Sequence, residues 1–221
     1  MTPETIVGLV QQALEVTLLI SAPLLLAVTP TLPAKNVREL VALGKARPGE
    51  LAFGSSGSGT STHLSGELLK SVTGIKMTHV PYKGSGQALI DVMAGHVPMT
   101  FGSITASVEL LKSGRLRAVA ITSEKRYPQL PGVPTFAESG YQSLVIGSWY
   151  AVWLPSKAPE AIVSKLHADI VRVLNLPEVR NRIIELGGEP VGNSPAEFDA
   201  FQKAEMARWA KVIKESGAKP E

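Results

Sequence analysis

Short apolar runs of strand type alternate with longer stretches of helical periodicity through the middle of the chain. The runs are LAFG (51–54), KMTHV (76–80), VPMTF (97–101), LRAVAIT (116–122) and VIGSWYAVWL (145–154). Strands separated by helices of about 10–15 residues indicate crossover connections and a largely parallel sheet covered on both faces. The pattern therefore predicts an α/β protein.

Another apolar run, VTLLISAPLLLAV (Val16–Val28), lies near the start of the chain. It has 13 residues and contains Pro23, whereas a helix that spans a membrane needs about 20 apolar residues. No Lys or Arg occurs before Lys35, although a secretory signal begins with basic residues. We therefore expect a buried strand, no membrane span and no signal peptide, so the chain expressed as given is expected in the cytoplasm.

The part after Trp153 changes character. Residues 155–175 and 194–216 repeat apolar positions at helical spacing and read as amphipathic helices. We expect them to cover a second lobe.

Composition narrows the classes of function. The chain has 221 residues, 44% of them hydrophobic, with a formal net charge of +3 and no cysteine. Such a chain can bury a core, and it has no basic block for nucleic acid. Cysteine nucleophiles and Cys-ligated zinc are excluded, and the four histidines have no metal-ligand spacing. We expect neither a metal nor a cofactor.

Most predicted helices begin with a carboxylate in the first turn, where it can pair with the helix dipole and the cap amide. These starts are Asn36 with Glu39, Thr135 with Glu138, Ser194 with Glu197, Pro159 with Glu160, and Pro177 with Glu178.

Three other helix starts have no acid nearby. They are capped near Thr60 or Ser61, near Ser85 and near Ser103, and their first acids come only at Glu67, Asp91 and Glu109. Each follows a predicted strand, and in an open parallel sheet the carboxyl ends of the strands form the edge where ligands bind. Because the first amides of a helix lack intrahelical partners and carry partial positive charge, these starts indicate an anion site. Ordinary hydroxyl capping is the alternative.

Two side chains near these starts are candidate ligand donors. The ring of His63 lies in the first turn of its helix and could reach a bound carboxylate, or make a structural hydrogen bond instead. Tyr82, in a Pro-Tyr-Lys-Gly turn, could donate its hydroxyl.

Sequence motifs for nucleotides and catalysis are incomplete. GSSGSGTST (54–62) has no lysine where a P-loop needs one and no third glycine for a dinucleotide fingerprint. It also fails the nucleophile-elbow pattern. A serine hydrolase using Ser56 or Ser58 remains a weaker alternative to a protein without catalytic residues.

Several segments resemble the substrate-binding proteins of tripartite tricarboxylate transporters, the Bug-type family. They include GSSGSGTSTHLSGELL (54–69), VPYKGS (80–85), LPGVPTFAE (130–138), SWYAVWLPSKAP (148–159) and ARWAKVIKESGAKPE (207–221). The likeness runs from about Val16 to the end. It implies a type II periplasmic-binding-protein-like fold of two lobes with largely parallel sheets, which closes on a small carboxylate and delivers it to a membrane permease.

The resemblance also assigns parts of the chain. Residues 29–147 would form the second lobe, and 1–28 with 148–221 a remnant of the first, which lacks a strand and a glycine-rich loop found in relatives; residues 1–15 match nothing recognised. Dimerisation could complete it. Gly102 stands where many relatives have an aspartate. The expected ligand-binding residues are Ser55, Ser56, Ser58, Gly59, Thr60, Ser61, His63, Tyr82, Lys83, Gly84, Ser85, Gly102 and Ser103.

The leading hypothesis is a non-enzymatic solute-binding protein, or a shortened form of one, for a dicarboxylate or related anion. By resemblance it would be periplasmic. The alternative from another class is a cytoplasmic effector-binding sensor domain of similar fold, although the chain lacks a helix-turn-helix segment and a basic DNA-facing patch.

Overall fold

The computed structural model describes residues 13–217, and this part of the chain divides into two compact units. Unit 1 contains residues 13–22 and Trp149–Ala207, and unit 2 contains Pro23–Ser148 and residues 208–217. The expected lobe membership of residues 1–12 and 218–221 lies outside the described residues.

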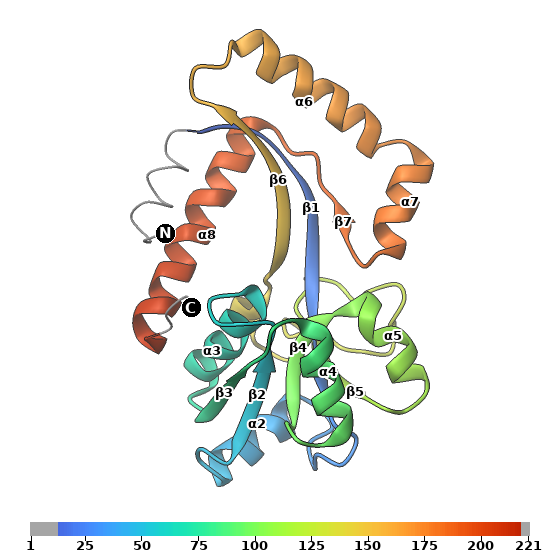
Figure 1. Cartoon of the computed structure of the whole chain (residues 1–221), viewed down its shortest axis with the longest axis vertical. Helices are drawn as coiled ribbons and strands as arrows, with labels where there is room; N and C mark the ends of the chain where they lie inside the picture. Colours follow the sequence, from blue (N-terminus) through green and yellow to red (C-terminus); the bar gives the residue numbers. More distant parts are fainter. Residues whose placement is uncertain (1–12, 218–221) are drawn as a thin grey trace. The chain divides into compact units, whose positions relative to one another are not determined.

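The sheet of unit 2 has the strand order β3-β2-β4-β1-β5. The strands are β1 (Ala13–Val28), β2 (Leu51–Ser55), β3 (Met77–Pro81), β4 (Met99–Ser103) and β5 (Arg117–Ile121). β2 runs parallel to both β3 and β4, whereas β1 is antiparallel to β4 and β5. The expected apolar runs are therefore strands, and the sheet is parallel except for β1 (Figure 1).

Helices cover both faces of this sheet because successive residues of a strand point to opposite faces. On β1, Leu26 belongs to one apolar cluster with Phe53 and Leu40, and Leu25 belongs to a second with Leu89. The helices are α2 (Val37–Ala46), α3 (Ser61–Thr73), α4 (Ser85–Ala94) and α5 (Ile104–Lys112), followed by the 3₁₀ turn η1 (Gln142–Leu144). The first cluster lies against α2 and α3, and the second against α4 and α5.

Unit 1 is built on the first part of β1. Two strands, β6 (Gly147–Pro155) and β7 (Glu189–Pro190), pair with β1, and the helices are α6 (Glu160–Leu174), α7 (Pro177–Glu185) and α8 (Pro195–Ser216). The predicted amphipathic stretches after Trp153 are therefore helical. Trp149 and Trp153 of β6 pack against Phe198 of α8, at ring-centroid distances of 6.2 and 5.2 Å.

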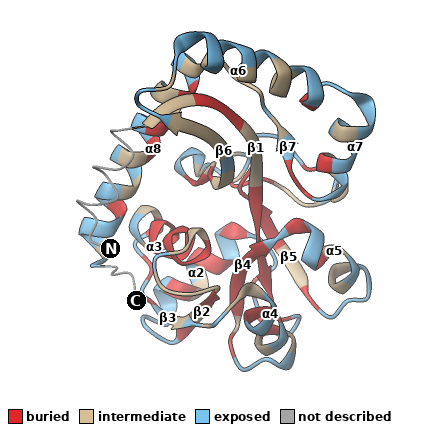
Figure 2. Cartoon of the chain, turned by 45° about the horizontal axis from the view of Figure 1, so that its top comes forward, coloured by how far each residue is buried: buried red, intermediate tan, exposed pale blue. Residues whose placement is uncertain are grey.

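Apolar exposure is concentrated in unit 1. Six of the eight exposed large apolar side chains of the described residues belong to it: Tyr150, Ile162, Val173, Leu176, Leu186 and Val191. Figure 2 shows the contrast between β4 and the last part of β1, which are mostly buried, and α6 and α7, which are mostly exposed. Within residues 13–217, no helix has both the length and the apolar character needed to cross a bilayer.

One predicted helix start is a turn. Thr135 and Glu138 form the reciprocal hydrogen bonds of a capping box, at 2.8 and 3.0 Å, but no helix follows them. Gly140 has a φ of +89° within this turn, and a left-handed residue so close to the cap ends the segment before a helix can extend.

Candidate functional site

Three helices of unit 2 begin at one edge of its sheet. α3 follows β2, α4 follows β3 and α5 follows β4. The strand β2 is parallel to both β3 and β4, so all three run in the same direction. Their carboxyl ends therefore lie at the same edge (Figure 1). None of the three helices has an acidic residue in its first turn, as the sequence predicts.

The start of α3 is capped by Thr60, one of the two expected caps. Thr60 Oγ1 accepts from the His63 amide at 3.4 Å and donates to the Gly57 carbonyl at 2.7 Å. Thr60 thus joins the helix to the loop before it. Gly57 has a φ of +132°, a backbone conformation that favours glycine because other residues are strained there.

The serines of this loop bond within unit 2. Ser55 Oγ donates to the Gly57 carbonyl at 3.1 Å, and Ser56 Oγ lies 2.9 Å from Thr62 Oγ1. Ser61 Oγ lies 2.8 Å from Ser148 Oγ. These contacts shape the loop, and the amides of Ser56, Gly57 and Gly59 also donate within it, to Thr62 Oγ1, Ser55 Oγ and His63 Nδ1.

The start of α4 differs from the expectation. Gly84, with a φ of +149°, is the N-cap, and Ser85 is the first helical residue. Glycine suits this cap position because a residue with a side chain would be strained at this φ. The side chain of Lys83 is exposed beside this start, and its amide donates to Gln87 Oε1 at 3.3 Å.

Tyr82, which lies between β3 and α4, directs its hydroxyl at α4. It donates to Asp91 Oδ2 at 2.7 Å. Burial and this hydrogen bond raise the pKa of Tyr82 to about 12, and the same bond lowers the pKa of the Asp91 carboxyl. The structure therefore gives the expected ligand donor an internal acceptor.

The start of α5 is capped by Ser103 as expected, although its side chain makes no capping hydrogen bond. Gly102 is buried just before it. A Cβ atom at Gly102 would meet only Leu89 Cδ2 at 3.8 Å and Ser107 Oγ at 3.9 Å, which are ordinary van der Waals contacts. The absence of a carboxylate here removes negative charge without any steric requirement for glycine.

Of the four helix starts within residues 13–217 that carry acids, α2 and α8 are capped by their own side chains, whereas α6 and α7 make no side-chain capping bond. At α2, the Glu39 amide donates to Asn36 Oδ1 at 2.9 Å and the Lys35 amide donates to Glu39 Oε2 at 2.7 Å. The bond from the Lys35 amide lowers the pKa of Glu39. At α8, the corresponding bond from the Ser194 amide lowers the pKa of Glu197. The feature that distinguishes α3, α4 and α5 from these helices is therefore the missing first-turn acid and not the absence of a side-chain cap.

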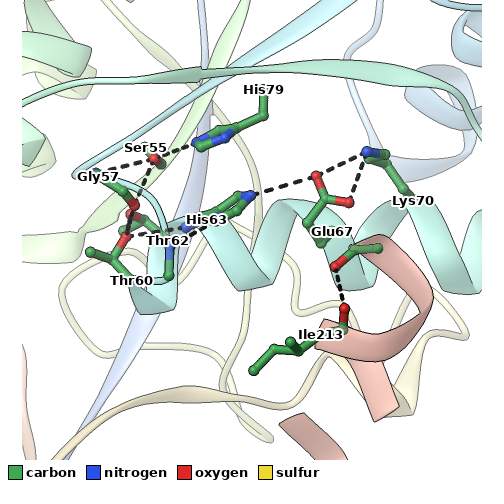
Figure 3. A network of polar contacts seen from close by, with 11 residues as sticks. Ser55, Gly57, Thr60, Thr62, His63, Glu67, Lys70, His79 and Ile213 are labelled. Carbon is green, nitrogen blue, oxygen red and sulfur yellow. Dashed lines mark hydrogen bonds and ion pairs between the residues drawn. The ribbon is translucent and has the colours of Figure 1, made fainter. Parts of the chain in front are cut away.

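His63 is buried, and its ring contacts the loop. Its Nδ1 accepts from the Gly59 amide at 2.9 Å, and its ring stacks on that of His79 at a centroid distance of 3.7 Å (Figure 3). Of the two roles weighed for this ring, the structure shows a structural hydrogen bond. The sequence analysis missed His79 and Thr62; the parallel register that places His79 beside Phe53 is the signal that could have identified His79.

The residues present offer little support for catalysis or metal binding. The hydroxyl of Ser56 pairs with that of Thr62. The imidazole of His63 contacts the Gly59 amide, and that of His79 contacts the Ser55 hydroxyl. In the range 13–217, no three His, Cys, Asp or Glu side chains are grouped in a way that could hold a metal ion.

Comparison with known proteins agrees with the geometry. Residues 9–218 match the family described as "Tripartite tricarboxylate transporter family receptor". Protein BugT of Bordetella pertussis is 38% identical over 197 residues, which are 89% of this chain and 60% of BugT. The chain thus spans about 60% of the length of this curated relative.

Two solved structures share the fold. R. palustris Rpa4515 with adipate is 38% identical, with a TM-score of 0.80, and the match covers 95% of this chain and 70% of Rpa4515. MatC (Rpa3494) from Rhodopseudomonas palustris with bound malate is 30% identical, with a TM-score of 0.75, covering 91% and 69%.

These matches confirm the predicted α/β periplasmic-binding-protein-like fold, with part of the relatives' length absent from the match. The family is one of periplasmic receptors rather than enzymes, which favours the solute-binding hypothesis over the hydrolase and sensor alternatives. The chain belongs to the tripartite tricarboxylate transporter receptor family.

Proposed function

We propose that this chain captures a small dicarboxylate at the edge of unit 2 where α3, α4 and α5 begin, and that it serves as the ligand-capturing part of a tripartite tricarboxylate-type transporter. The observation that carries the proposal is the absence of first-turn acids from these three helices alone among the helix starts compared above.

The physical basis is the charge of a helix N-terminus. Each start carries about half an elementary positive charge and up to four amides without intrahelical partners. Three starts at one sheet edge can therefore donate hydrogen bonds to two carboxylate groups without an arginine or a metal. The exposed Lys83 adds a full positive charge beside α4.

The site is proposed to comprise the thirteen residues expected from the sequence, with the first-turn backbone amides of α3, α4 and α5 as the principal donors. Tyr82 and His63 then belong to its supporting structure, since their polar groups contact Asp91 and Gly59. The adipate and malate bound by the two relatives are both dicarboxylates, which supports this ligand class for the present chain.

We assign the wider context from the family. The partners are the membrane permease subunits of such a transporter, and the location is the periplasm. Residues 29–147 are assigned to the second lobe, and 1–28 and 148–221 to the first. The two-unit division differs from this assignment in grouping Pro23–Val28, Ser148 and residues 208–217 with the residues assigned to the second lobe.

Calorimetry with adipate and malate tests the proposal, using two serine variants that introduce the same charge at opposite ends of helices. Ser85→Asp supplies a carboxylate in the first turn of α4, where it stabilises the helix by about 0.3–1 kcal/mol. It should weaken dicarboxylate binding by about tenfold or more, because its charge repels the ligand. Ser113→Asp adds the same charge at the C-cap of α5.

The paired result separates binding from folding. Ser113→Asp should lower stability slightly and leave the dissociation constant unchanged, whereas Ser85→Asp should raise stability and lose affinity. Equal affinities for the two variants, or no heat with either dicarboxylate for the unmodified chain, would reject the proposed site.

A further inference from the structure

We propose that His63 and His79 are positioning residues of the anion site: together they hold the loop Ser55–Thr60 in its binding shape, and His63 does so only while its Nδ1 carries no proton. The inference rests on the proposed function for its ligand, whereas the loop geometry stands independently. We call these two rings the imidazole pair.

The state of His63 follows from its hydrogen bond. The Gly59 amide lies 2.9 Å from His63 Nδ1. A backbone N–H can only donate, so Nδ1 must accept and its lone pair must be free of a proton. The proton of the neutral ring is then on Nε2, which lies 3.8 Å from Glu67 Oε1.

His79 holds the other end of the loop. Its Nε2 lies 2.7 Å from Ser55 Oγ, which in turn donates to the Gly57 carbonyl at 3.1 Å and accepts from the Gly57 amide at 3.2 Å. The two rings stack at 3.7 Å with an interplanar angle of 11°. Gly57 and Gly59 are thus linked to one ring stack through Ser55 and His63, immediately before the N-cap of α3.

The stack lies against the body of unit 2. Phe53 of β2 packs on His79 at a ring-centroid distance of 5.1 Å. Because the rings are supported from the sheet side, a displacement of either imidazole is transmitted to the loop rather than absorbed by open space.

Glu67 lies beside the imidazole pair, with its Oε1 3.8 Å from His63 Nε2, and Lys70 pairs with Glu67. Glu67 is 5% exposed, and both of its carboxylate oxygens bind Lys70 Nζ, at 2.9 and 2.8 Å. Glu215 of α8 lines the same groove as Glu67 and Lys70. With Lys70 pairing Glu67 in this way, the carboxylate beside His63 Nε2 is already balanced.

Protonation of His63 at Nδ1 removes the acceptor of the Gly59 amide. The Gly59 N–H and a protonated Nδ1 are both donors, so the 2.9 Å contact cannot persist, and two facing imidazoles 3.7 Å apart oppose charge on both rings. The loop must therefore rearrange when His63 takes up a proton, and histidine ordinarily titrates between about pH 5 and 8. Anion affinity is thereby linked to the protonation of a side chain that need not touch the ligand.

Two variants separate the hydrogen bond from the ring. His63→Asn keeps an acceptor oxygen near the position of Nδ1 and does not titrate, and His63→Phe keeps an aromatic ring for stacking but has no acceptor. His96→Asn is the matched control, because the His96 side chain is 71% exposed and pairs with Asp91.

Two measurements are made on each protein between pH 5.5 and 7.5: the hydrogen exchange of the Gly59 amide without ligand, and adipate affinity by calorimetry. His63→Phe should lose the Gly59 protection and weaken adipate binding by about tenfold, the equivalent of one hydrogen bond. His63→Asn should stay within about threefold at pH 7.5. The ratio of its dissociation constant to that of the unmodified chain cancels the titration of adipate itself, and this ratio should fall as the pH is lowered.

The outcomes are distinguishable. If adipate binds to none of the proteins, the proposed function fails, and the exchange of Gly59 still decides the inference. A ratio that is independent of pH together with equal Gly59 protection in the unmodified chain and His63→Asn would overturn it. So would Gly59 protection in His63→Phe equal to that of the unmodified chain. If His63→Phe does not fold, the comparison of His63→Asn with the unmodified chain decides the inference alone. If His96→Asn changes the pH dependence of adipate affinity as much as His63→Asn does, the inference is also overturned.

Discussion

Gly66 of α3 lies directly against the ring of Phe53 of β2: a Cβ atom on Gly66 would stand 2.5 Å from Phe53 Cδ2. This close approach sets how near α3 lies to the sheet, and thereby where its N-terminus and the candidate site are held. Phe53 is fully buried and also packs on His79, so it has little room to move away.

Replacing Gly66 by alanine should therefore destabilise the protein. We expect a loss of about 1–3 kcal/mol from overpacking, which exceeds the gain of about 1 kcal/mol in helix propensity. Gly86→Ala in α4 is the control, because nothing lies within 4 Å of the added carbon. Urea unfolding should give a lower midpoint for Gly66→Ala and an equal or higher one for Gly86→Ala; the opposite order would contradict this packing.

The helix caps should differ in their effect on stability. Asn36 accepts the Glu39 amide at 2.9 Å, so Asn36→Ala should cost about 0.5–2 kcal/mol. Ser103 makes no side-chain capping bond, and Ser103→Ala should change the free energy of unfolding by less than about 0.5 kcal/mol. Chemical denaturation of both variants measures this difference, and equal losses would show that the Ser103 hydroxyl does cap α5.

The capping box formed by Ser194 and Glu197 at the start of α8 should make the free energy of unfolding depend on pH in the acidic range. Hydrogen bonds from the Ser194 amide and hydroxyl lower the pKa of Glu197 below its ordinary 4.5. A lowered pKa contributes stability that is present above the ordinary value and is lost as the pH falls through the folded value. Glu197→Gln should thus be less stable than the unmodified chain at pH 7, and the difference should shrink below about pH 4. A difference that is constant with pH would contradict the pairing.

The Tyr82–Asp91 contact predicts a late tyrosine ionisation. The pKa of Tyr82 is raised to about 12, so its neutral form stabilises the fold below its ordinary pKa of about 10 and this contribution is lost as the pH rises toward 12. In an ultraviolet titration, the unmodified chain should show a tyrosine that ionises near pH 12, and the Tyr82→Phe variant should lack it. The variant should also unfold at a lower urea concentration and bind dicarboxylates within about twofold of the unmodified chain, since the hydroxyl already has an internal acceptor. A large loss of affinity would place the hydroxyl at the ligand instead.

Much of the fold could be predicted because periodicity reports burial directly. The runs that begin at Leu51 and Val97 each contain a strand, and the long stretch at Val16–Val28 lies within β1. The antiparallel course of β1 could not be predicted, because an apolar run buried on both faces has the same pattern in either direction. The missing helix after Thr135 had no sequence signal either, since its cap is well formed and only the conformation of Gly140 ends it.

Side-chain roles were harder to predict than the helix starts. The absence of acids near Thr60 and Ser103 follows from the sequence alone, whereas the partners of Tyr82 and His63 depend on tertiary distances. A hydroxyl or imidazole beside a helix start has the same sequence signature whether it faces a ligand or, as here, Asp91 and Gly59.

The central claim is that three helix starts of unit 2 jointly bind a dicarboxylate. Backbone NMR of the labelled chain titrated with adipate tests it most directly. The amides of Ser61–His63, Ser85–Gln87 and Ile104–Ala106 should shift together along one saturation curve. Shifts confined to one of these helices, or centred on α2 or α7, would contradict the account.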